Sequence, residues 1–403
     1  MENIPKIRYQ EFTVQWKKQK IGSITTSYSG GTPKSSNKNY YSGEIPFIRS
    51  GELNSDMTAL FINEEALKDS SAKLVEKGDI LYALYGATSG EVSISKINGA
   101  INQAILAIKP HEYYSPEFIV NFLKKEKDNI LDKYLQGGQG NLSAAIIKGL
   151  EISLPTYSEQ SAIGSLFCTL DDLLADYKEN LVNYKAFKAS MLSKMFPKSG
   201  QTVPEIRLAA FEGEWETRKL KRLVERVTRK NSDLVSERAL TISAQYGLVD
   251  QEEFFNKKIA SKDVRGYYLI RNGEFAYNKS YSNGYPFGAI KRLDKYDFGV
   301  LSTLYILFKP VDVNSDYLAC YYESGKWYKE VSMCAAEGAR NHGLLNIAPN
   351  DFFNTLIVLP KTLEEQKAIG SFFSNLDTLI TSYQEKISQI ETLKKKLLQD
   401  MFA

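Results

Sequence analysis

The sequence contains two copies of one frame, and this repetition limits what the chain can fold into. The segment Ile4 to Trp16 returns as Val203 to Trp215, with the shared pattern Pro-x-Ile-Arg-x-x-x-Phe-x-x-x-Trp. A second motif begins at Leu154-Pro155 and returns at Leu359-Pro360. In both copies it continues through Glu-Gln, Ile-Gly-Ser and Leu-Asp to a final Met-Phe. The interiors between these borders share little sequence. We therefore expect one scaffold, used twice, that presents two different surfaces.

The composition is that of a globular protein without a membrane anchor. The 403 residues suffice for two domains of ordinary size, and 43% of them are hydrophobic and 25% charged. No apolar run reaches the length of roughly 18 residues that a membrane span needs. The first residues lack a signal-peptide core, so we expect a cytoplasmic protein. Three cysteines without a close C-x-x-C pair argue against a disulfide framework and against a zinc site.

Charge gives a weaker indication of partners. A net charge of +3 permits nucleic-acid binding but does not point to it unaided. Three basic clusters are candidate phosphate contacts, although each is also compatible with a solvated surface. They are Lys17-Lys18 with Lys20, Lys124-Lys125 with Lys127, and the stretch from Arg218 to Lys230.

The repeated tails have the pattern of long helices. Apolar residues recur at alternating steps of three and four from Ile163 to Met195 and from Ile369 to Met401, which is typical of a coiled-coil seam. The predicted helices run from about 158 to 196 and from about 364 to 402. A threonine followed three residues later by a glutamate predicts a capping box at each helix start. The matching seam positions are Leu170, Leu173, Tyr177, Leu376, Leu379 and Tyr383.

A single helix of this kind exposes an apolar seam that it cannot bury alone. We therefore expect the two helices to pair with each other in antiparallel orientation, which returns the end of the chain to its beginning. The breaker-rich segment 197–204 separates the halves. The resulting domain organisation is a globular domain at 1–154, a spacer helix at 155–197, a second globular domain at 198–359 and a second spacer helix at 360–403.

Each globular domain reads as a mixed α/β (α+β) fold. Short apolar runs bounded by glycine and polar residues predict strands, and amphipathic helices follow Pro110 and Pro310 at matching places. The predicted strands are 45–48, 80–84, 104–108 and 150–154 in the first half, and 239–242, 274–277, 304–308 and 356–359 in the second.

With these features the chain resembles a known family, the specificity subunits of type I restriction-modification systems. The resemblance spans the whole length. It rests on the duplicated head, on Leu-Pro followed by Glu-Gln-x-x-Ile-Gly before a long helix, and on the sequence Ile-Pro-Phe-Ile-Arg-Ser-Gly at 45–51. Two variable domains separated by two repeated helices are its most specific element.

The resemblance implies a non-catalytic subunit that reads double-stranded DNA. Each variable domain would be a target recognition domain for one half of a split, asymmetric site. The helices would set the distance between the half-sites and dock two methyltransferase subunits. Restriction subunits with motor and nuclease activity would complete the assembly. The family pattern also implies no cofactor on this chain, with the methyl donor and ATP bound by the partner subunits.

The residues themselves favour a DNA reader over an enzyme. The sequence has no G-x-x-x-x-G-K-[S/T] loop, no Asn-Pro-Pro-Tyr or Asp-Pro-Pro-Tyr element and no well-placed glycine loop for a methyl donor. His111 and His342 occupy non-equivalent positions, so a shared histidine-based catalytic site is not expected. Two alternatives remain: a coiled-coil adaptor that binds only proteins, and a methyltransferase fused to its own reader, which the missing cofactor motifs disfavour.

Base readout needs amide, guanidinium and hydroxyl groups on exposed loops, because bidentate pairs with guanine and adenine discriminate best. Glycines beside such groups let backbone amides approach phosphates. In the first domain the candidates are Arg49, Ser50, Tyr82, Tyr85, Thr88, Ser89, Gln103, Gln136, Gln139 and Asn141. In the second domain they are Arg229, Lys230, Gln245, Tyr246, Asn278, Lys279, Tyr281, Tyr285, Ser302, Arg340 and Asn341.

Overall fold

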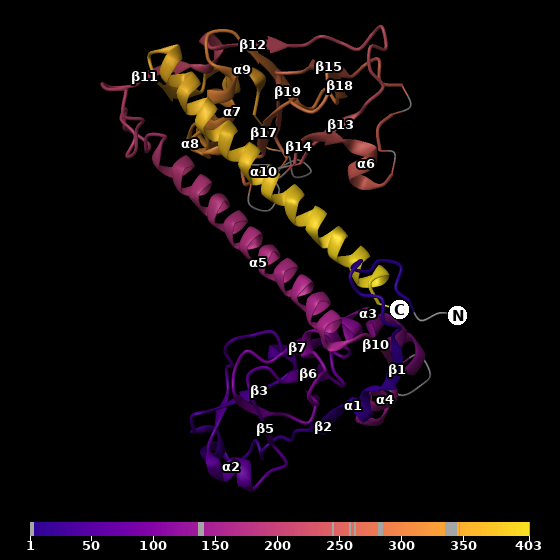
Figure 1. Cartoon of the computed structure of the whole chain (residues 1–403). Helices are drawn as coiled ribbons and strands as arrows, with labels where there is room; N and C mark the ends of the chain where they lie inside the picture. The colour runs from indigo at the N-terminus through magenta and orange to yellow at the C-terminus, as the bar shows by residue number, and fades with distance from the viewer. Residues whose placement is uncertain are drawn as a thin grey trace. The chain divides into compact units, whose positions relative to one another are not determined.

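The computed structural model describes residues 4–135, 141–243, 246–257, 259–261, 263–280, 285–334, 345 and 347–402 (Figure 1). It divides into two compact units. Unit 1 comprises Met1–Lys178 with Glu385–Ala403, and unit 2 comprises Glu179–Gln384. Each unit contains strands and helices, which confirms the predicted mixed α+β class. None of the described helices is both long and apolar enough to cross a lipid bilayer.

The core of unit 1 is a four-stranded antiparallel sheet in the order β2-β9-β6-β7. A second sheet, β4-β3-β8-β5, contains one parallel pair, and β1 pairs with β10. The strands are β1 (Lys17–Lys20), β2 (Thr25–Ser29), β3 (Ile45–Ile48), β4 (Phe61–Ile62), β5 (Lys73–Val75), β6 (Ile80–Ala83), β7 (Val92–Ile94), β8 (Gly99–Ile101), β9 (Ile105–Pro110) and β10 (Glu151–Leu154). The helices are α1 (Ile21–Ile24), α2 (Glu64–Lys68), α3 (Pro116–Leu135) and α4 (Ala144–Gly149).

Unit 2 repeats the four-stranded sheet and the separate strand pair on a different sequence, but in place of the second four-stranded sheet it has two two-stranded sheets, β13-β14 and β15-β18. Its four-stranded sheet has the equivalent order β12-β19-β16-β17, and β11 pairs with β20 as β1 pairs with β10. The strands are β11 (Glu216–Lys219), β12 (Val224–Val227), β13 (Leu240–Ser243), β14 (Gly247–Asp250), β15 (Tyr268–Arg271), β16 (Phe275–Asn278), β17 (Ala289–Arg292), β18 (Phe298–Leu301), β19 (Ile306–Pro310) and β20 (Leu356–Leu359). The helices are α6 (Gln251–Phe255), α7 (Ser315–Glu323), α8 (Tyr328–Cys334) and α9 (Pro349–Asn354).

The repeated head and tail motifs meet at a buried ion pair in unit 1. Arg8 donates two hydrogen bonds of 2.7 Å to the Glu159 carboxylate, and the Trp16 indole donates a third at 3.3 Å. Thr156 caps the helix as predicted, because its hydroxyl accepts from the Glu159 amide at 3.4 Å. The predicted capping box also has the Glu159 carboxylate bind a backbone amide at the helix start, but the carboxylate binds Arg8 and Trp16 instead. It lies fully buried and serves Arg8 and Trp16, which a charged group in an apolar core requires.

The same contacts recur in unit 2. Arg207 bonds to the Glu365 carboxylate at 2.7 and 2.8 Å, and the Trp215 indole donates to it at 3.1 Å. Each glutamate lies in the first turn of a long helix, and each Arg-Trp pair lies in the head segment of the same copy. The frame is therefore repeated in sequence because each half needs the same buried ion pair to join its head to its helix.

The repeated helices are α5 (Tyr157–Lys194) and α10 (Leu363–Asp400), each 38 residues long. Contacts inside each unit confirm that they run antiparallel. In unit 1, Lys178 pairs with Glu391 at 2.6 Å. In unit 2, the rings of Tyr184 and Tyr383 lie 5.3 Å apart. Residues with higher numbers in α5 therefore lie beside residues with lower numbers in α10.

The buried seam of α5 departs from the predicted one at Leu173. Leu170 and Leu376 are buried as expected, and Tyr177, Leu379 and Tyr383 are half-buried. Leu173 is 38% exposed, whereas its neighbour Leu174 is only 7% exposed. The prediction that Leu173 lies in the seam is wrong. An α-helix repeats every 3.6 residues, so the seam drifts away from a strict 3.5-residue pattern.

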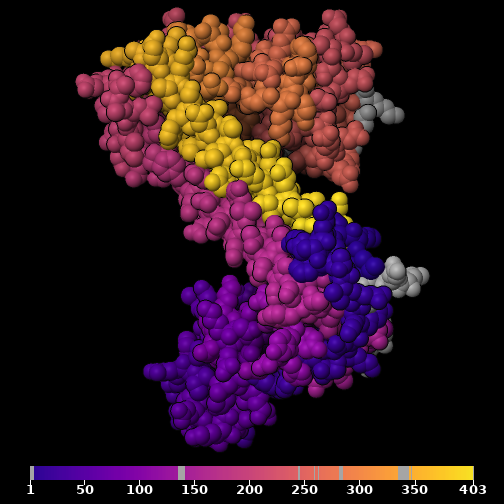
Figure 2. All heavy atoms as spheres, viewed as in Figure 1, coloured from indigo at the N-terminus to yellow at the C-terminus, as the bar shows by residue number. Residues whose placement is uncertain are grey.

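The end of α10 lies against the N-terminal segment (Figure 2), and Met401 and Phe402 belong to the core of unit 1. The backbone amide of Ile7 donates to the carbonyl of Asp400 at 2.9 Å. Phe402 is buried and lies 4.8 Å from the Phe118 ring and 6.0 Å from the Phe167 ring. The two ends of the chain thus pack against each other within one core.

In unit 2 the same place is filled by the end of α5. The Ile206 amide donates to the Lys194 carbonyl at 3.0 Å. Phe196 lies 5.6 Å from the Tyr317 ring and 6.1 Å from the Phe373 ring. Each head segment therefore continues the end of a long helix, which is covalently attached in unit 2 and non-covalently packed in unit 1.

Candidate nucleic-acid interface

In unit 1, strand register brings several predicted residues to one edge of the four-stranded sheet. Ala83 at the end of β6 pairs with Ile105 at the start of β9, and Ser29 at the end of β2 pairs with Leu106. The loops 30–44, 84–91 and 102–104 consequently leave the sheet from the same edge. They carry Tyr85, Thr88, Ser89 and Gln103.

The second sheet adds Arg49 and Ser50 to this edge. β3 and β8 are parallel, with Ile48 opposite Ile101, and the Asn102 amide donates to the Ile48 carbonyl at 3.3 Å. Arg49 is exposed and hydrogen-bonds Glu52 at 3.0 and 3.3 Å. Burial alone would raise the pKa of Glu52, but hydrogen bonds from Arg49, Ala59 and Thr58 outweigh burial and lower it to about 2. The lowered pKa keeps Glu52 negatively charged, so Glu52 stays paired with the Arg49 guanidinium.

Unit 2 has an equivalent edge with different side chains. Tyr277 in β16 pairs with Ile306 in β19, and Val227 at the end of β12 pairs with Leu307. The loop residues 228–230, 279–280, 285–288 and 302–305 lie at this edge. With the end of β16 they carry Arg229, Lys230, Asn278, Lys279, Tyr285 and Ser302. Tyr246 lies at the turn after β13, which reaches the same edge because Ala239 forms a parallel bridge with Val300. We call these two sets of loops the reading edges.

A further loop joins each reading edge at the same point. In unit 1 the Leu142 amide donates to the Leu84 carbonyl at 2.9 Å, which places Asn141 beside the β6–β7 loop. In unit 2 the Leu345 amide donates to the Lys279 carbonyl at 3.0 Å, where the β16–β17 loop begins. These two contacts are equivalent, since Leu84 and Lys279 directly follow β6 and β16. The remaining candidates, Gln136, Gln139, Gln245, Tyr281, Arg340 and Asn341, lie outside the described residues.

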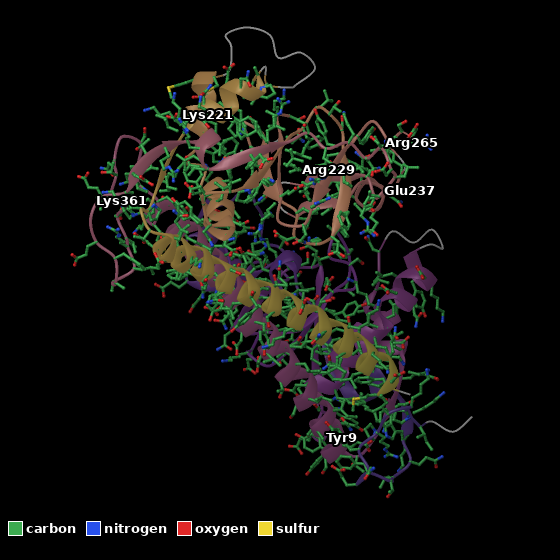
Figure 3. All side chains as sticks on the ribbon, turned by 90° about the horizontal axis from the view of Figure 1, so that it is seen from above. Tyr9, Lys221, Arg229, Glu237, Arg265 and Lys361 are labelled. Atoms are coloured by element: carbon green, nitrogen blue, oxygen red, sulfur yellow. The ribbon has the colours of Figure 1, made fainter. Side chains whose placement is uncertain are left out.

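Three basic candidates of unit 2 are also bound to their own domain. Arg229 donates to Glu274 at 2.8 and 3.0 Å, and Figure 3 shows it among the strands, inward from Glu237 and Arg265. Lys230 donates to the Gly266 carbonyl at 2.8 Å and lies 4.3 Å from the Tyr268 ring centroid. Lys279 donates to the Ile347 carbonyl at 3.3 Å, and burial lowers its pKa. These contacts fix where their positive charges lie on the reading edge.

Tyr82 is the one described candidate that lies in the core. Its side chain is 0% exposed, as is that of Tyr277 at the equivalent place in β16. Burial raises the pKa of both phenols well above the ordinary value. The prediction that Tyr82 is exposed for DNA contact is therefore wrong, because its side chain packs in the core of unit 1. The signal was present in the sequence, since Tyr82 stands in a continuous apolar run with no polar alternation.

Sequence reasoning missed the loop that follows β2. Thr32 hydrogen-bonds the side chain of Gln103, so this loop positions a candidate reader. Gly30 lets this loop pass close to the backbone of Ile101, because a Cβ at residue 30 would lie 1.9 Å from the Ile101 carbonyl oxygen. Within the described residues, no group of three histidine, cysteine, aspartate or glutamate side chains is arranged to hold a metal ion. The side chains named at both edges carry hydrogen-bonding groups, and the edge of unit 2 also carries Lys230 and Lys279.

The chain is similar to proteins of one family along its length. Residues 13–184 match the family described as the type I restriction modification DNA specificity domain. The type I restriction enzyme MjaVIII specificity subunit of Methanocaldococcus jannaschii is 21% identical over 415 residues, which cover 98% of this chain and 94% of the relative. The MjaIX specificity subunit of the same organism is 25% identical over 269 residues, which cover 56% of this chain and 62% of the relative.

Two solved structures share the fold. The S subunit of a type I restriction-modification system from M. genitalium has a TM-score of 0.60 at 16% identity, over 99% of both chains. A chain from a study of complex assembly and conformational transition in the type I system has a TM-score of 0.53 at 13% identity, over 97% of this chain and 98% of that chain. The duplicated frame, the repeated sheet order and these matches together make the chain similar, over nearly its whole length, to the specificity subunits of type I restriction-modification systems.

Proposed function

We propose that this chain reads DNA for a type I restriction-modification complex, with each recognition domain reading one half of a bipartite, asymmetric site. The observation that carries the proposal is the pair of reading edges, which share a topology but not their side chains. A scaffold that repeats its strands and varies its loops is suited to two different base sequences. As a specificity subunit the chain supplies recognition, and the catalytic steps belong to other subunits.

The chemistry of the reading edges supports base readout. Gln103 and Asn141 in unit 1 and Asn278 in unit 2 carry amides that can pair with adenine, and Arg49 carries a guanidinium that can pair with guanine. Lys230 would contact phosphates, which would orient the duplex without reading its sequence. Because the two edges differ, we expect the two half-sites to differ.

The repeated frame supports two copies of one partner. A surface that occurs twice in one chain, on α5 and α10, offers two equivalent docking places. We propose that two methyltransferase subunits occupy them and that restriction subunits join this assembly. The paired helices would then set the number of unspecified base pairs between the half-sites. The methyl donor and ATP would be bound by these partners, and the complex would act in the cytoplasm.

Methylome sequencing of cells with and without this gene tests the proposal directly. We expect a bipartite methylated motif that disappears when the gene is deleted. Replacing residues 22–149 with the first variable domain of another family member should change one half of the motif and leave the other half intact. An unchanged methylome after deletion would favour a protein adaptor, and a change in both half-sites would contradict independent reading.

A further inference from the structure

Charged residues join the two long helices at equivalent places in the two units. In unit 1, Lys394 of α10 hydrogen-bonds Asp171 of α5. In unit 2, Lys188 of α5 hydrogen-bonds Asp377 of α10 at 2.6 Å. The tail repeat relates Asp171 to Asp377 and Lys188 to Lys394, so the aspartate of each copy pairs with the lysine of the other. These pairs interrupt a seam that is otherwise largely apolar.

In unit 2 a third element joins the pair. Lys188 donates to both carboxylate oxygens of Glu323, the last residue of α7, at 2.8 Å each. The lysine is only 8% exposed although it is charged. Burial by itself would lower the pKa of Lys188, but Glu323 and Asp377 outweigh burial and raise it, so the lysine stays charged. One buried cation therefore ties α5, α10 and a helix of the recognition domain together.

Unit 1 has a related cluster, in which the third residue is a lysine instead of a glutamate. Asp171 is shared by Lys394 of α10 and by Lys124 of α3, which lies at 3.7 Å. α3 and α7 occupy equivalent positions, since each follows the last strand of its four-stranded sheet. In both units the helix pair is thus linked by charge to the recognition domain.

An apolar seam resists separation but specifies position weakly, because leucines can interchange their contacts. Lys188 is buried, while Glu323 and Asp377 are 38% and 54% exposed, so the cluster differs from the surface pairs through its buried cation. A buried charged group with its partners adds little net stability, and its best-established effect is to select one arrangement. From this geometry we infer that Lys188, Glu323 and Asp377, with Asp171 and its lysines as their counterpart, are positioning residues that hold each recognition domain on the helix pair and so determine which half-site spacing is accepted. This inference rests on the proposed DNA-reading function.

The test separates positioning from stability within the intact complex. Lys188→Met leaves two carboxylates without their cation, so we expect lower thermal stability as well as altered spacing. The triple variant K188M/E323Q/D377N removes all three charges and replaces them with similar shapes, which should restore stability. Asp377→Asn alone, which leaves Lys188 paired with Glu323, should give the same change in spacing at smaller amplitude if the triple variant does not fold.

The readout is methylation at sites whose gap is one base pair longer or shorter than the cognate gap, measured by methylome sequencing. We expect the triple variant to lose discrimination against these sites by about tenfold, the effect of one charge-assisted hydrogen bond. The matched control K178M/E391Q removes an exposed pair between the same helices, with side chains 55% and 50% exposed, and should keep full discrimination.

The outcomes distinguish the inference from the proposed function. A stable triple variant with wild-type discrimination would overturn the inference and make the cluster purely structural. An equal loss in the K178M/E391Q control would also overturn it, because any charge between the helices would then suffice. Absence of a bipartite motif with the wild-type chain would instead refute the proposed function. Lys188→Arg keeps the cation. Wild-type discrimination against the altered gaps in this variant, together with its loss in Lys188→Met, would support the inference.

Discussion

At the scale of single residues, the buried glutamates of the frame explain why Arg, Trp and Glu recur together. Glu159 and Glu365 each combine a helix start with an ion pair to a distant head segment. The sequence alone predicted the helix start from the Thr-x-x-Glu spacing. It could not predict the arginine partner, because the contact joins residues that are 151 positions apart. Local rules describe local bonds, and the ion pair depends on the complete fold.

Replacing Glu159 by alanine should be strongly destabilising. Arg8 and the Trp16 indole would lose their acceptor inside the core, and removing one partner of a buried pair costs about 3 to 5 kcal/mol. Urea denaturation of the purified chain measures this. The control is Glu64→Ala, which removes an exposed pair with Lys68 and should cost less than about 0.5 kcal/mol. Equal effects of both substitutions would contradict a special role for Glu159.

Glu52 gives the chain a pH dependence of known sign. The pKa of Glu52 in the folded state, about 2, lies below the ordinary value of 4.5. Its hydrogen bonds therefore stabilise the fold fully at pH values above 4.5. That contribution should fall as the pH decreases from about 4.5 toward 2. Thermal melting of wild type and Glu52→Gln should differ at pH 6 and converge near pH 2. A difference that grows toward low pH would refute the assignment.

At the scale of elements, all eight strands and both long helices predicted from the sequence are present, because hydrophobic periodicity is a local signal, whereas the remaining strands of the described residues were not predicted. The runs at 45–48 and 356–359 became β3 and β20 without change. The sequence did not reveal that the two interiors share one strand order. Sheet order depends on hydrogen bonds between distant segments, and it tolerates different side chains as long as their burial is kept. The reading edges were likewise recognisable only as separate loops until the strand register joined them.

The phase of the helix seam can be tested with two neighbouring leucines. Leu174→Ala should cost about 2 kcal/mol or more, because it removes buried contacts between α5 and the rest of unit 1. Leu173→Ala should cost less than about 1 kcal/mol, because this side chain is 38% exposed. Chemical denaturation of both variants decides the point. A larger effect at Leu173 would restore the phase predicted from the sequence.

At the scale of the whole molecule, two recognition domains share one pair of helices. The sequence predicted this organisation from the repeat alone, with boundaries at 154, 197 and 359. The division into two compact units instead falls inside the helices, near Lys178 and Gln384. Each half of each helix therefore packs with one recognition domain, which periodicity could not indicate. The domain boundaries themselves remain predictions.

Lengthening both helices together should lengthen the gap between half-sites. Seven residues inserted after Leu181 and seven after Gln384 add about 10 Å of helix. This distance corresponds to about three base pairs of DNA. Methylome sequencing of the variant should return the same half-sites with a longer gap. Altered half-sites with an unchanged gap would show that the helices do not set the spacing.

The packing of Phe402 against Phe118 and Phe167 has a consequence for synthesis on the ribosome. Unit 2 is a continuous stretch of chain from Glu179 to Gln384, so its core can close as soon as that stretch has emerged. Unit 1 begins first but needs residues 385–402 to complete its core. We therefore expect unit 2 to complete its core before unit 1, the reverse of the usual order in which the N-terminal domain folds first. We expect the apolar surface of the first recognition domain to stay exposed until residues 385–402 have been synthesised.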